Sequence, residues 1–200
     1  MANPNAPFGF RVVAHRSGHP SNKTNEYVIA SGYATGLFLG DAVTLDGSGQ
    51  VNIAVAGSAI VGIFQGCRYT DSTGAVQYRK NWPASTVSAD AVAIVADDPA
   101  LVLEAQSVGS MTAADIGQFV NIDTSVAGST VTGFSNMQAS ASGGAENQFR
   151  IYGVYGVGVN QKPVRDSSGN QAYLATGTNA QVLLTIANHV MAGSAVGVEV

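Results

Sequence analysis

The sequence predicts an all-β protein, with a β-barrel or β-sandwich body, an extended N-terminal arm and one short helical turn. Three observations lead to this prediction. No segment repeats apolar residues at the helical period over ten residues. Short runs of β-branched and aromatic residues recur along the chain instead. The 24 glycines lie between these runs without a period, as a fold with many turns requires.

Residues 1–24 are predicted to form the arm. They contain Pro4, Pro7 and Pro20 and show no strong periodicity. Proline removes a backbone donor and fixes φ, so we expect this segment to run extended over a surface rather than join a β-ladder. All its charged residues are cations, and the first acid of the chain is Glu26.

Residues 25–82 are predicted to form a β-rich N-terminal lobe. Its β-forming runs are residues 27–29, 42–45, 51–55, 60–64, 68–70 and 75–78. The run 60–64 is continuously apolar, which favours a strand buried on both faces. Residues 46–49 and 71–74 each begin with Asp and end with Gly, as do residues 166–169 in the second half. This pattern is typical of hairpin turns, and it lacks the alternating acids and distal Glu of a calcium loop.

Residues 83–200 are predicted to form a second β-rich lobe packed on the first, although residues 25–200 could equally form one continuous domain. Two expected strands, 92–95 and 101–104, flank a break at Asp97-Asp98-Pro99. Residues 112–117 resemble one helical turn, with Thr112 as the N-cap and Asp115 at capping-box spacing. Further strands are expected at residues 118–122, 129–132, 149–152, 154–159 and 181–187, and loops at residues 136–147 and 161–179.

Charge is sparse and unevenly distributed. Charged residues make up 11% of the chain, against about 25% in typical globular domains, which is common where a protein buries its exterior against copies or partners. The net charge of −4 argues against a nucleic-acid binder. Between Pro83 and Phe149 there are seven acids and no Lys or Arg. This region is either a solvated acidic face or an acidic lobe opposite the basic arm.

Neither a secretory signal nor a membrane span is apparent. The first ten residues have no basic start and no apolar core. The longest apolar runs, residues 58–64 and 92–96, are far shorter than the ~20 residues that a membrane-spanning helix needs. We therefore expect a protein that is made in a cytoplasm and does not bind membranes.

No motif indicates an enzyme, a cofactor or a metal. A nucleophile elbow, a Walker A loop and a dinucleotide fingerprint are all absent. His15 and His19 have metal spacing only on a helix, which Pro20 disfavours. Asp97 and Asp98 are neighbours and would point to opposite faces of a strand. Cys67 is expected to be a buried, inert thiol, and the aromatic residues Phe64, Tyr78 and Trp82 are expected in the core.

Several stretches, taken together and in order, resemble small virion proteins encoded near the major capsid protein of tailed bacteriophages. They are residues 2–10, residues 61–69 with the turn 71–74, Trp82-Pro83, Asp98-Pro99, residues 112–117 and Asn188-His189. The chain thus resembles the capsid decoration (cement) proteins of tailed phages. The resemblance implies a protein on the outer surface of the expanded capsid, commonly a homotrimer, that clamps neighbouring major capsid subunits. It implies no catalytic residues.

The arm is the predicted docking element. Phe8 and Phe10 are its apolar anchors, and Arg11, Arg16 and Lys23 are its cations. The alternatives are a tail or fibre module that binds carbohydrate through Trp82 and nearby tyrosines, or a polysaccharide-degrading enzyme that uses the scattered acids.

Overall fold

Antiparallel β-structure dominates the computed structural model, which describes residues 3–18, 23–143, 147–157, 162–165, 171–173 and 175–192. In these residues the only helix is a 3-10 turn, η1 (Ala113–Asp115), and the strands form two large open sheets with three short pairs. The all-β prediction is confirmed. Both large sheets keep two unpaired edges in the described residues, so the body resembles a sandwich and not a closed barrel.

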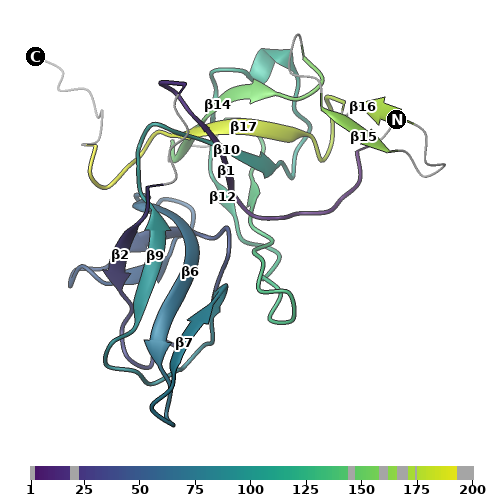
Figure 1. Ribbon diagram of the computed structural model, residues 1–200. Helices are drawn as coiled ribbons and strands as arrows, with labels where there is room; N and C mark the ends of the chain where they lie inside the picture. Colours follow the sequence, from purple (N-terminus) through teal and green to yellow (C-terminus); the bar gives the residue numbers. More distant parts are fainter. Residues whose placement is uncertain are drawn as a thin grey trace, which may run out of the picture.

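The two large sheets belong to two lobes, which lie one above the other in Figure 1. The first sheet, in the lower lobe, has the order β2 (Asn25–Val28), β9 (Val92–Ala96), β6 (Gly62–Thr70), β4 (Ala42–Leu45), β5 (Val51–Ile53), with β7 (Val76–Arg79) paired to β6. The second sheet has the order β1 (Arg11–His15), β10 (Leu101–Gln106), β17 (Gln181–Ile186), β14 (Phe149–Val154), β11 (Phe119–Val120).

The short pairs extend the lobes. They are β3 (Leu37–Phe38) with β8 (Asn81–Trp82), β12 (Ile122–Asp123) with β13 (Gln138–Ala139), and β15 (Pro163–Arg165) with β16 (Gln171–Tyr173). The predicted strand at residues 129–132 is wrong, because these residues belong to a long connection between β12 and β13. The predicted loops were also too long, since β13 and the β15–β16 hairpin lie inside them.

Each lobe has its own hydrophobic core, and the first sheet separates the two cores where the lobes meet. Phe64 and Val95 point into the core of the first lobe. Their strand neighbours Ile63 and Ala96 point into the core of the second lobe. Residues 60–64 are therefore buried on both faces, as their apolar run predicted. Towards the other end of the sheet, this second face carries exposed side chains such as Val28, Val76 and Tyr78.

The chain crosses between the lobes in a way that the sequence did not reveal. β1 lies at the edge of the second sheet, and β9 pairs with β2 and β6 in the first. The predicted division after Trp82 therefore does not coincide with the sheets. The crossing from first to second sheet falls instead at Asp97-Asp98-Pro99, the break between β9 and β10.

Local turn chemistry follows the predictions. The Asp46 carboxylate accepts from the amides of Ser48 (2.8 Å) and Gln50 (2.9 Å), and Asp71 repeats the pattern with Thr73 and Ala75. Gly49 and Gly74 close these turns at φ of 75° and 84°. The third such turn, at residues 166–169, lies outside the described residues. Thr112 and Asp115 form the predicted capping box around η1.

No helix among the described residues has the length and apolar character needed to cross a bilayer.

Candidate docking surface

The N-terminal segment is fixed to the protein's own second lobe. The Asn3 side-chain amide donates to the Ala175 carbonyl (2.7 Å) and accepts from the Ala175 amide (3.1 Å). The Gln106 side chain accepts from Ala6 N–H (3.2 Å) and donates to the Pro4 carbonyl (2.7 Å). Figure 1 shows this segment running along the upper lobe into β1. The expectation of an arm that joins no ladder is therefore wrong for residues 11–15, which pair with β10.

Phe10 is a core residue and cannot be the predicted docking anchor. Its side chain is 1% exposed and stacks on Phe149 with ring centroids 4.8 Å apart. Gly9 allows the chain to place Phe10 in the core, because Gly9 has φ of 76° and a Cβ there would lie 2.6 Å from the Ser135 side chain. Phe8 is half-buried, with the Arg11 guanidinium 4.6 Å from its ring centroid.

Of the predicted docking cations, Arg11 is partly engaged and the other two are exposed. Arg11 lies 3.9 Å from the carboxylate of Glu104, which is 3% exposed and also pairs with Lys162. Arg16 and Lys23 are exposed. Within the described residues no contact joins them to Phe8 or Arg11. Of the five predicted docking residues, the structure thus brings together Phe8, Phe10 and Arg11, which line a small cavity of about 210 Å³.

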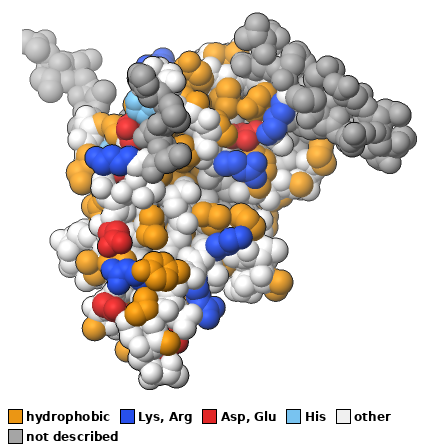
Figure 2. Space-filling view, viewed as in Figure 1, with side chains coloured by type: hydrophobic (Ala, Val, Ile, Leu, Met, Phe, Trp, Pro, Cys, Tyr) orange, Lys and Arg blue, Asp and Glu red, His pale blue; other side chains and the backbone are white. Residues whose placement is uncertain are grey.

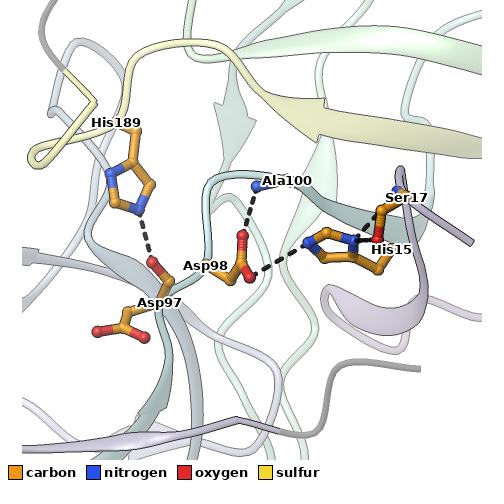
Figure 3. Close-up of polar contacts among 6 residues, drawn as sticks. All are labelled: His15, Ser17, Asp97, Asp98, Ala100 and His189. Carbon is orange, nitrogen blue, oxygen red and sulfur yellow. Dashed lines mark hydrogen bonds and ion pairs between the residues drawn. The ribbon is translucent and has the colours of Figure 1, made fainter. Parts of the chain in front are cut away.

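The acids Asp97 and Asp98 belong to the junction between the lobes (Figure 3). Asp98 accepts from Ala100 N–H (2.8 Å) and lies 3.2 Å from His15 Nε2. Asp97 accepts from the Tyr27 hydroxyl (2.6 Å), while its backbone carbonyl accepts from His189 Nε2 (3.0 Å). The carboxylates thus serve different strands and do not converge on one substrate position, as predicted from their adjacency.

His189 is 2% exposed, and its Nδ1 accepts from Met191 N–H (3.0 Å), so its Nε2 carries the proton. His189 and its neighbours also connect the lobes through the backbone. The Ile60 amide donates to the Asn188 carbonyl (2.8 Å), and the Val190 amide donates to the Ile60 carbonyl (2.9 Å). These bonds connect the two lobes, and the His189 side chain adds a further contact through the Asp97 carbonyl.

Other carboxylates also accept hydrogen bonds from groups of the same chain. Asp90 accepts from the Thr70 hydroxyl (2.6 Å) and from the Ser88 hydroxyl (2.7 Å), and Asp123 accepts from Ser125 N–H (2.8 Å). By contrast, exposed cations are spread over both lobes: Arg16, Lys23, Arg79, Lys80 and Arg150. The chain therefore carries a negative net charge but presents several cations to solvent.

Cys67 and two of the predicted core aromatics are buried, and Tyr78 is not. Phe64 and Trp82 are fully buried. Burial raises the pKa of the Cys67 thiol to about 12, so it stays protonated at neutral pH, as expected of an inert thiol. Tyr78 is 73% exposed, and its predicted core position is wrong. Because Trp82 is buried, it cannot stack on a sugar. The described residues contain no group of side chains that could hold a metal ion.

Tyr78 belongs to an open face of the first sheet. Cross-strand pairing aligns Val28, Val92, Arg68 and Tyr78 in one row across β2, β9, β6 and β7. Val28 is 51% exposed, and the Arg68 guanidinium pairs with Glu26 at 3.6 Å. In Figure 2 apolar side chains interleave with basic and acidic ones over this lobe. We call Val28, Arg68, Val76, Tyr78, Val92 and Ile94 the open sheet face.

Sequence reasoning missed the open sheet face. Side chains alternate between two faces along residues 76–79, but this alternation does not show which face the rest of the protein covers. The bulge between Phe64 and Gly66 also breaks the alternation along β6, so Phe64 and Cys67 point to the same side and Arg68 to the other.

Comparisons with known proteins identify no family for this chain. No protein-family model, no curated protein and no solved structure matches the chain.

One buried carboxylate, Asp41, ties the lobes together. It is 2% exposed and accepts from Phe38 N–H (2.7 Å) and from the Ser135 side chain. Burial raises its pKa from 3.8 to about 6, and the two hydrogen bonds oppose this rise only in part. Asp41 is therefore more readily protonated in the folded chain than in the unfolded chain.

We expect the free energy of unfolding to rise by about 1 kcal/mol as the pH is lowered from about 7 to about 5, because folding favours protonated Asp41. Below about pH 4 stability should fall. Hydrogen bonds, above all from the Thr73 hydroxyl, lower the pKa of Asp71 to about 2, and the Thr70 hydroxyl has the same effect on Asp90. Protonation of these carboxylates removes the stabilisation that the hydrogen bonds provide. Urea denaturation across this range measures both effects. Asp41→Asn should abolish the rise and keep the fall, and an unchanged rise would contradict the assignment to Asp41.

Proposed function

We propose that this protein is a structural component of a tailed-phage virion, which binds the outer surface of the expanded capsid and stabilises it by clamping neighbouring major capsid subunits. The resemblance of the sequence to decoration proteins supports this proposal. The observation that carries it furthest is the open sheet face, because an exposed sheet surface that carries Tyr and Arg side by side has the composition of a protein-binding hot spot.

The energetics of such docking favour the open sheet face over the N-terminal segment. Tyr78 is exposed, and docking would bury its large, rigid side chain at a low cost in conformational entropy. Arg68 is already oriented by Glu26, so less freedom is lost when a partner approaches. The exposed cations Arg16, Lys23 and Lys80 would mainly speed the encounter with an acidic shell. A homotrimer at three-fold sites remains part of the proposal, and it rests on the resemblance.

A decoration protein acts by mass action, because a ligand that binds only the assembled shell stabilises that shell. A symmetric lattice repeats the same site many times, so modest affinities per copy suffice. The proposal therefore requires binding to expanded shells and weaker binding to free capsid subunits.

We expect Tyr78→Ala to weaken binding to expanded, undecorated shells at least about tenfold, because truncation of a hot-spot aromatic typically has this effect. The shells would be assembled from the major capsid protein encoded in the same genome, and binding would be measured by co-sedimentation at increasing protein concentration. Tyr152→Ala is the matched control, since Tyr152 is 56% exposed on β14 of the other sheet. Its affinity should stay within about twofold of wild type.

Two results would count against the proposal. If Tyr152→Ala loses binding and Tyr78→Ala does not, docking uses the second sheet. If the wild-type protein binds no expanded shell but binds sugars on a glycan array, the protein is a carbohydrate-binding module.

A further inference from the structure

A cavity of about 580 Å³ lies on the opposite side of the first sheet from the open sheet face. One wall is the β3–β8 pair, with Phe38 and the following Pro83. The other wall is the connection between β12 and β13, with Val126 and Met137. Ligand sites for small molecules typically have volumes of about 300–1,000 Å³ and predominantly apolar walls. The cavity has both properties.

The walls of this cavity are held in place before any ligand arrives. The Leu39 amide donates to the Gly133 carbonyl (3.0 Å), and the Ser135 amide donates to the Leu39 carbonyl (3.0 Å). Gly128 packs so closely on the Phe38 ring that a Cβ there would lie 2.3 Å from a ring carbon. Such a preorganised cavity loses little entropy on binding.

Two polar side chains at the cavity have no hydrogen-bond or ion-pair partner among the residues that the structure describes. Arg79 and Asn81 both line it, and in the described part of the chain neither side chain forms a hydrogen bond or an ion pair. Asp41 also lines the cavity, but its carboxylate is 2% exposed and already accepts from Phe38 N–H and the Ser135 side chain. The available donors are therefore a guanidinium and an amide, which together suit an anionic oxygen.

We propose that this cavity binds a small organic anion with a compact apolar body, the body lying between Phe38 and Val126 and the anionic group on Arg79 and Asn81. The apolar walls supply the affinity, and the charged donor selects an acid over a neutral molecule of the same shape. This inference is independent of capsid binding.

Adamantane carboxylate and adamantane methanol test the inference, because they share one apolar body and differ in charge. Isothermal titration calorimetry with the full chain should show binding of both, the carboxylate more tightly. Arg79→Gln should weaken binding of the carboxylate about tenfold, as the loss of one charge-assisted hydrogen bond does, and change binding of the alcohol less than about twofold. Arg150→Gln is the matched control, since Arg150 is an exposed cation on β14 that does not line the cavity. It should leave both affinities unchanged.

A second variant tests the cavity itself. Val126 is 45% exposed at the cavity wall, so Val126→Trp should fill the space without disturbing the core and should abolish binding of both compounds. The proposal is overturned if the wild-type protein binds neither compound at about 1 mM. It is also overturned if Arg79→Gln and Arg150→Gln have equal effects, or if Val126→Trp binds both compounds as the wild type does.

Discussion

Replacing Phe10 by alanine is expected to lower the free energy of unfolding by about 3–5 kcal/mol, the usual cost of removing a buried aromatic ring. Phe10 is 1% exposed in the core of the second lobe and stacks on Phe149 at an interplanar angle of 19°. Its backbone amide also donates to the Gly40 carbonyl (2.8 Å) at the junction with the first lobe. A cavity at this position cannot collapse easily, because both lobes would have to move. Guanidinium denaturation followed by circular dichroism measures the change.

Phe8→Ala provides the control for this experiment. Phe8 is half-buried, and its ring contacts the guanidinium of Arg11, whose side chain is 58% exposed. Its removal should cost only about 1 kcal/mol. If both substitutions had the same small effect, the N-terminal segment would not be packed into the second lobe.

Lys162→Met is expected to destabilise the protein by roughly 3 kcal/mol, because it leaves the buried Glu104 carboxylate without its nearest cation. Glu104 is 3% exposed on β10, and Lys162 Nζ donates to it and to Gln181 Oε1. Arg11 approaches Glu104 only to 3.9 Å, so it compensates in part. Lys162 is itself 33% exposed, and we therefore expect a value at the lower end of the usual range for buried pairs.

A double-mutant cycle separates the unpaired charge from the lost packing. Glu104→Gln combined with Lys162→Met should recover at least half of the loss measured for Lys162→Met alone, because no buried charge remains. Chemical denaturation at pH 7 gives all four free energies. If the losses of the two single variants simply added in the double variant, the two side chains would not be coupled.

The features that local chemistry determines could be predicted from the sequence. The carboxylates of Asp46 and Asp71 bond to amides two and four residues later, so the turn pattern contains all the participants. The same is true of the capping box between Thr112 and Asp115. The apolar run 60–64 predicted a strand buried on both faces, because apolar residues at every position of a strand need cover on both sides.

The role of the N-terminal segment could not be predicted, because its partners are distant. Arg11–His15 pairs with β10, and Phe10 stacks on Phe149. Prolines at positions 4, 7 and 20 suggested an arm outside any ladder, but none of them lies within β1. β1 has only three apolar residues, Val12 to Ala14, and they are flanked by Arg11 and His15, so the run is too short to indicate a strand by itself.

The candidate surfaces were beyond sequence reasoning for a related reason. Which side of β7 is exposed depends on what covers β6, and the second lobe covers only one end of it. The proposed anion cavity combines residues 35–41, 79–84 and 124–137, and no local pattern connects these segments. Arg79 and Asn81 appear in the sequence as ordinary strand residues.

The crossing of the chain between the lobes sets an order for its emergence from the ribosome. Every strand of the first sheet lies between Asn25 and Ala96, so that sheet is complete before β10 is translated. β1 is translated before all of them, yet among the described residues its one strand partner is β10. β1 therefore remains unpaired, with Phe10 exposed beside it, during the time in which the first lobe is synthesised and begins to fold. Long-range pairing of this kind is slow, and exposed strand edges promote association between nascent chains. The two cations, Arg11 and Arg16, at the ends of β1 would oppose such pairing between copies during this interval.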